Sequence, residues 1–261
     1  MNNIFNAQRF FKLLNKHTRE HYKTYLISTA VLIGILSLLM GCTAYLSGGQ
    51  FGTNAQFGYF YIFLFLCGAI FTSMIFANLG DKKKSIPALT LPVSNLERFV
   101  VGWIYSYLIF QVIFVICFFT IDLIVISVGN MNPGVRNVLI NSDENSDKLL
   151  MAFLIFGLVH ASAFFGAIFF EKMQFIKTMF SVFIVLIILQ LINIPLINFF
   201  FKISTRMQPI FAGVSLYETG KDPYVFIRPT ADSYHVLMIM CLLVTLVLWA
   251  ATFFKLKEKQ V

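Results

Sequence analysis

The sequence contains six apolar stretches, each about as long as a helix that crosses a bilayer. They cover Tyr25–Tyr45, Gly58–Leu79, Phe99–Ile126, Leu149–Phe170, Thr178–Phe200 and Tyr234–Phe254. A helix rises about 1.5 Å per residue, so roughly 20 residues cross a hydrocarbon core of about 30 Å. Lipid offers no partner to an unpaired backbone amide, and the short alternating segments of a β-barrel are missing. The sequence therefore predicts an all-α integral membrane protein with six transmembrane helices.

The composition agrees with a chain that faces lipid. Only 12% of the residues are charged, against about 25% in an ordinary soluble domain. The 31 Phe residues suit a lipid-facing surface. The net charge of +8 comes mostly from basic residues between the apolar stretches. At such positions they indicate membrane orientation and contact with anionic lipid, and we expect no nucleic-acid partner.

The distribution of Lys and Arg predicts the orientation. Segments on the side of the N-terminus hold 14 of these residues and segments on the other side hold 6. The excess marks the cytoplasmic side, so both termini are predicted in the cytoplasm. The expected division is an amphipathic interfacial helix at 1–24, a transmembrane domain at 25–254 and a tail at 255–261. That domain would have a cytoplasmic loop at 80–98 and outer loops at 129–148 and 201–233.

The first 24 residues carry five cations three or four positions apart, and apolar residues cluster on a separate face. This pattern is typical of a helix lying in the headgroup plane, although a simple orientation signal would also explain it.

In the fifth apolar stretch, Pro195 is expected to kink or end the helix. The outer loop 201–233 would form either short capping helices or a solvated connection.

Motifs for catalysis, cofactors or metals are missing. The four His residues form no convincing ligand cluster. Lys84-Ser85 has no Gly-rich loop before it, as a phosphate-binding loop would require. We therefore expect no enzymatic activity, no cofactor and no metal, and no hydrolysis of nucleotides by this chain itself.

Two polar residues within the apolar stretches form a possible intramembrane polar site. Asp122 lies about 35 Å along the helix from Phe99, so a hydrated position at the membrane surface is favoured over a proton or substrate site. His160 is surrounded by small residues that allow close helix packing. It is expected to hydrogen-bond another helix, with a proton relay as the alternative. Trp103 and Trp249 are expected at the membrane interface.

The inner loop Asp81–Arg98 is the most informative segment. Ser94 and Glu97 fit a capping box, in which each side chain bonds the backbone amide of the other residue. The third helix should therefore begin at Ser94, before it enters the membrane. The preceding residues, Ala88 to Val93, read ALTLPV; they follow Pro87 and include Pro92.

This loop resembles the cytoplasmic loop of bacterial type-2 ABC exporter permeases, which also have a Leu-rich turn, Leu-Pro-x-Ser and then a long span. The basic N-terminal segment and the six-span layout are similar too. The resemblance implies contact with a separate ATPase subunit, and a second permease subunit that completes the pathway. The coupling residues implied are Lys84, Ser85, Leu89, Leu91, Pro92, Ser94 and Glu97.

Two other functions stay open. The chain could be a membrane scaffold or immunity-type protein that transports nothing. It could also be a membrane enzyme with an outer site that uses Glu218, Asp222 or His235. The many Lys, Asn, Phe and Ile residues and the low use of Gly and Pro indicate the inner membrane of a bacterium.

Overall fold

The computed structural model describes residues 5–75, 93–140, 145–201, 214–216, 225–227 and 231–258. Six of the described helices are long and apolar enough to cross a membrane, with the third built from α5, η1 and α6. This confirms the predicted all-α membrane fold. Their bounds are α1 Ala7–Leu46, α2 Thr53–Ile75, α5 Asn95–Trp103, η1 Ile104–Ile109, α6 Phe110–Gly129, α7 Ser146–Phe169, α8 Gln174–Phe201 and α9 Ala231–Glu258.

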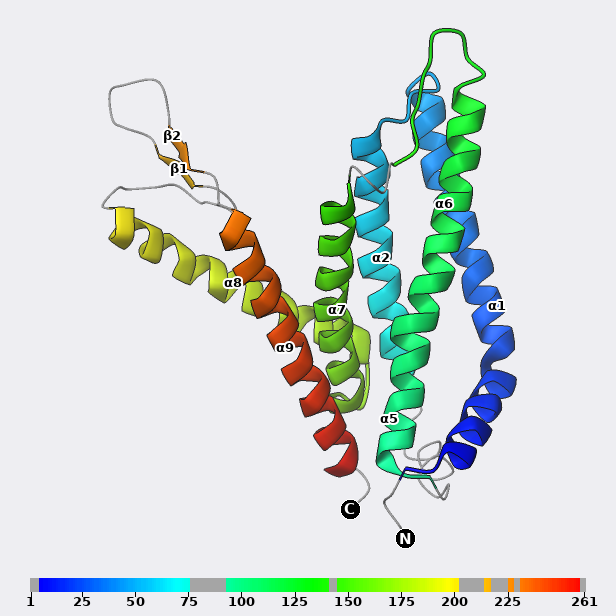
Figure 1. Ribbon diagram of the computed structural model, residues 1–261, viewed down its shortest axis with the longest axis vertical. Helices are drawn as coiled ribbons and strands as arrows, with labels where there is room; N and C mark the ends of the chain where they lie inside the picture. Colours follow the sequence, from blue (N-terminus) through cyan, green and yellow to red (C-terminus); the bar gives the residue numbers. More distant parts are fainter. Residues whose placement is uncertain are drawn as a thin grey trace.

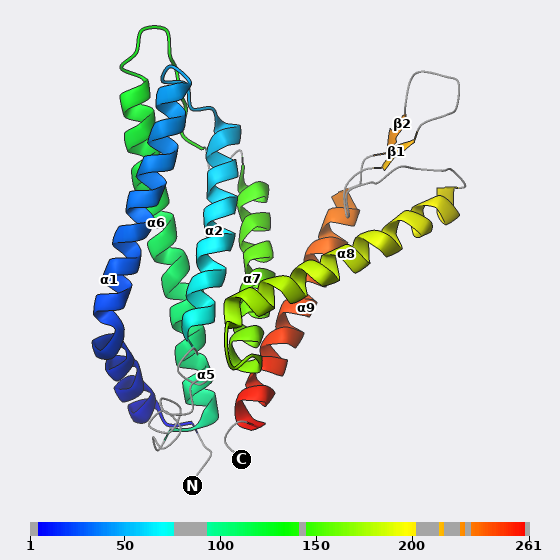
Figure 2. The same ribbon diagram turned by 180° about the vertical axis from the view of Figure 1, so that it is seen from behind.

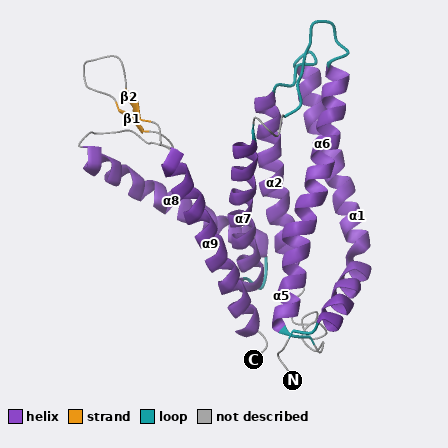
Figure 3. Cartoon of the chain, in the orientation of Figure 1, coloured by secondary structure: helices purple, strands orange, loops and turns teal. Residues whose placement is uncertain are grey.

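The beginning of α1 and the end of α9 lie at the same end of the molecule, which we call the terminal end (Figure 1). The turn between α1 and α2 lies at the opposite end, the distal end. Helices α1, α2, α5–α6 and α7 stand side by side between these ends, whereas α8 leans away from them (Figures 1 and 2). Helix α9 packs along α7 near the terminal end and follows α8 outward (Figure 3).

The predicted interfacial helix at 1–24 and the first predicted span belong to one helix. Helix α1 runs without interruption from Ala7 to Leu46, roughly 60 Å, which is about twice the thickness of a hydrocarbon core. The Asn6 side chain caps it by accepting from the amides of Gln8 and Arg9. No Pro or strong helix breaker separates the basic part from the apolar part, so the two form one helix.

A column of Phe rings fills the space between α2, α6 and α7. Phe60 contacts Phe114 and Phe118 at centroid distances of 5.5 and 5.1 Å, and Phe110 meets Phe156 at 5.7 Å. Gly68 makes room for this packing, because a Cβ there would come within 2.2 Å of the Phe156 ring. Many of the Phe residues expected to face lipid therefore form the core.

The distal end is closed by an Asn-rich segment. Asn137 donates to the Gly49 carbonyl at 2.8 Å and accepts from the Phe51 amide at 2.7 Å. The Gln56 side chain, fully buried in α2, bonds the backbone of Val138 and Ile140. Residues 130–140 are thus anchored across the turn between α1 and α2.

The part of the second long loop that the structure describes forms two short strands, not the short capping helices that were one expectation. Strands β1, Val214–Leu216, and β2, Val225–Ile227, pair in antiparallel register with Val214 opposite Ile227. Helix α8 continues six residues beyond Pro195, so Pro195 does not end it as one reading of the sequence expected.

Helices α7 and α8 meet at a tight contact near the terminal end. A Cβ on Gly166 would come within 1.8 Å of the Thr178 hydroxyl, so the small residue permits the close approach that the sequence predicted. Beyond this contact α8 leaves the bundle, and none of its most apolar 18 residues is buried. A surface of this kind is stable only against lipid or a partner.

Candidate functional site

The third transmembrane helix contains a single π-helical segment, η1, and two polar groups depend on it. The Phe110 amide bonds the Tyr105 carbonyl, five residues back, in place of the usual four. The buried positions accordingly step by five from Tyr105 to Phe110, but by four on either side. Tyr105 and Ser106 both lie in this segment, and both are buried.

His160 of α7 is fully buried and joins three helices. Its Nε2 lies 2.8 Å from the Ser106 hydroxyl of η1, and the Trp249 indole of α9 donates to its Nδ1 at 3.1 Å. The ring also stacks on Phe164 at 5.2 Å. This confirms the expected hydrogen bond between His160 and another helix.

These partners determine the tautomer of His160. An indole N–H only donates, so Nδ1 must accept and the proton of the neutral ring lies on Nε2. Nε2 then donates to Ser106, whose hydroxyl donates in turn to the Gly102 carbonyl at 2.8 Å. Both ring nitrogens of His160 are hydrogen-bonded, so the ring acts as a structural cross-link between helices. A proton relay through His160 would require one of these hydrogen bonds to break. Trp103 and Trp249 pack together at 5.3 Å, both half-buried in the bundle.

Asp122 does not join His160 in one polar site. It lies sixteen residues beyond Ser106, about 24 Å along the helix. The expected hydration of Asp122 is also wrong, because its side chain is fully buried within the bundle. Within the described part of the chain, neither carboxylate oxygen has a hydrogen-bond partner.

Ser94 and Glu97 form the predicted capping box at the terminal end. The Glu97 amide donates to Ser94 Oγ at 3.2 Å, and Glu97 Oε2 accepts from the Ser94 amide at 3.1 Å. The helix begins at Asn95, directly after Ser94, as the sequence predicted. The inner loop therefore ends in a rigid, capped turn.

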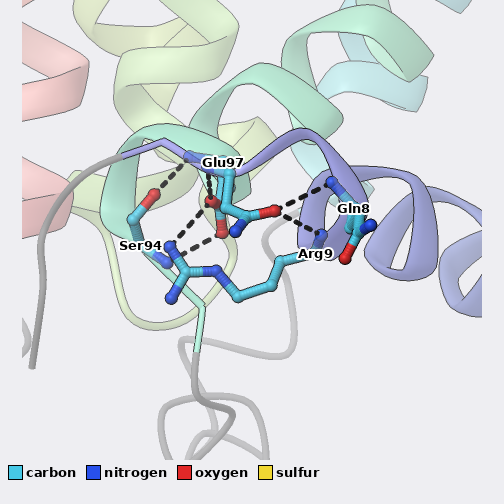
Figure 4. Close-up of polar contacts among 5 residues, drawn as sticks. Gln8, Arg9, Ser94 and Glu97 are labelled. Carbon is cyan, nitrogen blue, oxygen red and sulfur yellow. Dashed lines mark hydrogen bonds and ion pairs between the residues drawn. The ribbon is translucent and has the colours of Figure 1, made fainter.

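The second oxygen of Glu97 connects this turn to the beginning of α1. Glu97 Oε1 accepts from the Asn6 amide at 2.8 Å and from Arg9 Nη2 at 3.2 Å (Figure 4). The Glu97 side chain is fully buried, whereas that of Arg9 is 36% exposed. Sequence reasoning missed this link. The one available signal was Glu97 itself, an acidic residue at the end of a loop rich in Lys, with Arg9 in the N-terminal segment.

Several predicted residues lie outside the part of the chain that the structure describes. They are the coupling residues Lys84, Ser85, Leu89, Leu91 and Pro92, and the candidate enzyme residues Glu218 and Asp222. His235 is exposed on α9. In the described ranges no three His, Cys, Asp or Glu side chains come together as metal ligands. Ser94 and Glu97 are the predicted coupling residues that the structure describes, and they lie in contact.

Comparisons with protein-family models, curated proteins and solved structures found no match.

Replacing Glu97 tests the link between α1 and the capped turn. Glu97→Ala removes the capping box and the two bonds to Asn6 and Arg9. We expect it to destabilise the protein by about 2–4 kcal/mol, from a cap of about 1 and a charged hydrogen bond of about 1.5–3 kcal/mol. Glu97→Gln can still cap, so it should lose less than half as much. Unfolding in mild detergent, followed by circular dichroism, measures both.

Glu20→Ala is the matched control, because Glu20 pairs with Lys16 on the exposed face of α1. An exposed pair of this type contributes about 0.5 kcal/mol or less. If Glu97→Ala proved as mild as Glu20→Ala, Glu97 would not hold the two helices together.

Replacing each of the two Trp residues tests the His160 cross-link. Trp249→Phe keeps an aromatic ring but leaves His160 Nδ1 without its donor, at an expected loss of about 1–2 kcal/mol. Trp103→Phe is the control, because the Trp103 indole nitrogen has no partner among the described residues. The emission of the remaining Trp reports unfolding in each variant. Equal stability of the two variants would contradict the assigned hydrogen bond.

Proposed function

We propose that this chain is the membrane subunit of an ATP-driven ABC exporter in the bacterial inner membrane, with both termini in the cytoplasm. Loop 80–98 would bind a separate cytoplasmic ATPase subunit. A second permease subunit, identical or different, would pack against this chain to complete the transport pathway. The proposal combines the six membrane-spanning helices with the resemblance of the loop to those of type-2 exporter permeases.

The bridge through Glu97 is the observation that supports this proposal best. A subunit driven by a separate ATPase must carry movement from its loop into its membrane helices. Here the residue that ends the loop is buried and bonded both to its own helix and to the beginning of α1. A push on the loop would therefore move α1 and α5 together. A loop that merely connected two spans would need no such attachment.

The route of the movement follows from the packing. Helix α5 continues through η1 into α6, and α1 packs along α6. The π-helical segment interrupts the regular bonding of this helix, and such segments are frequent at functional sites. A shift that begins at Glu97 would reach the distal end through the pair formed by α1 and α6.

Co-purification of the tagged full-length protein in mild detergent, with mass spectrometry of its partners, tests the proposal. Wild-type protein should recover an ATPase subunit encoded beside it. A variant with Leu91→Asp and Pro92→Asp should lose this partner, because two carboxylates in an apolar contact leave buried charges unpaired. Met131→Asp, an exposed position at the distal end, should leave recovery unchanged.

The same experiment separates the exporter from the scaffold or immunity-type protein. Recovery of no ATPase by well-folded wild-type protein would reject the exporter proposal. Recovery of the ATPase by the loop variant as well would place the contact elsewhere and reject the role of loop 80–98.

A further inference from the structure

Helix α1 packs against α6 and α5, whereas α2 packs mainly against α7. The space left between α1 and α2 is a crevice of about 320 Å³ in the half nearer the terminal end. Buried side chains from three helices line its floor, among them Leu32, Phe63 and Phe110. Exposed side chains form its rim, including Val31 and Met74. The crevice therefore opens sideways, where a membrane protein meets lipid.

The space just described is the apolar chamber of the crevice. It adjoins a smaller, more polar chamber toward the terminal end. This chamber has about 200 Å³ and is lined by His17, His21 and Thr24. Tyr25 and Ser28 line both chambers. Tyr25 stands at the junction, since its hydroxyl lies 2.6 Å from His17 Nε2 and its ring stacks on Tyr105. Within the described part of the chain, the side chains of His21, Thr24 and Ser28 have no hydrogen-bond partner, which leaves them available to a ligand.

We propose that this crevice binds one acyl chain of an anionic phospholipid from the surrounding leaflet, with the lipid headgroup at His21, Thr24 and Ser28. The polar chamber lies where the apolar part of α1 begins, which is the level of the headgroups. The apolar chamber follows the next ten residues of α1, about 15 Å into the hydrocarbon. A cavity of about 150 Å³ takes up benzene, so this chamber has room for roughly a dozen carbon atoms.

The charges of α1 favour anionic lipid beside this helix. Lys16 is paired with Glu20 and Arg9 with Glu97. The other cations of this part of α1, Lys12, Arg19 and Lys23, have no acidic partner in the described ranges. A basic segment at the membrane surface concentrates anionic lipid beside it. The basic residues would thus attract the lipid, and the polar chamber would position it.

This inference concerns lipid binding alone and does not depend on an ATPase partner. The probe is phosphatidylglycerol with a diazirine in one acyl chain, incorporated into nanodiscs with the full-length protein and mapped by mass spectrometry after illumination. Cross-links should concentrate on the α1 and α2 residues of the apolar chamber. The exposed apolar face of α8, which lines neither chamber, is the internal reference.

Competition with unlabelled phosphatidylglycerol tests specificity in the wild-type protein. Unlabelled phosphatidylglycerol should reduce labelling of the crevice at a lower proportion than it needs to reduce labelling of α8, because it competes for a specific site in the crevice. A phosphatidylcholine probe with the same acyl chain should label the crevice less, because its headgroup has no net charge and the basic part of α1 concentrates anionic lipid. Equal dilution in the crevice and on α8 would overturn the proposed site, and equal labelling by the two probes would overturn the anionic headgroup.

Ser28→Trp places a large ring at the junction of the two chambers and should abolish most crevice labelling, while α8 labelling stays unchanged. Ala30→Trp is the control, because Ala30 is also small and exposed on α1 but lines neither chamber. Crevice labelling that survives Ser28→Trp in folded protein, or that Ala30→Trp removes equally, would overturn the proposal.

Discussion

The pairing of every backbone amide within its own helix is the constraint on which this structure depends. Water is missing from the hydrocarbon core, so a span that leaves the helix exposes polar groups at a cost of several kcal/mol each. The chain meets this requirement with long helices, two of which extend well beyond the bilayer thickness, α1 and the third helix from Asn95 to Gly129. Their excess length lies at the ends, where the polar contacts of Glu97 and Asn137 are found.

The π-helical segment departs from regular helical bonding within the third span, and two contacts of the bundle involve its residues. It directs Ser106 to His160, which fixes α7 and α9 to the third helix. It also buries Tyr105 beside Tyr25, where the polar and apolar chambers of the crevice meet. Ser106 and Tyr105 are neighbours in this segment, so the cross-link and the crevice meet at one place in the third helix.

Properties that depend on neighbouring residues could be predicted from the sequence. Six apolar stretches, the capping box of Ser94 and Glu97 and the small residues around Gly166 all act over short distances along the chain. Properties that depend on distant residues could not. Glu97 and Arg9 are 88 residues apart, and Trp249 and His160 are 89 apart, with no pattern that pairs them. Asp122 was placed at the membrane surface by counting residues, although burial depends on which helices surround the residue.

The central claim is a six-span topology that puts the terminal end, with Glu97, in the cytoplasm. Labelling of single cysteines in intact cells with a membrane-impermeant maleimide tests it most directly. The four native cysteines are first replaced by alanine, and Cys is then introduced at Lys12, Val138 or Glu258. We expect Val138→Cys to react in intact cells, and Lys12→Cys and Glu258→Cys to react only after permeabilisation. Reaction of Lys12→Cys and Glu258→Cys from opposite sides, or of either one together with Val138→Cys in intact cells, would contradict this topology.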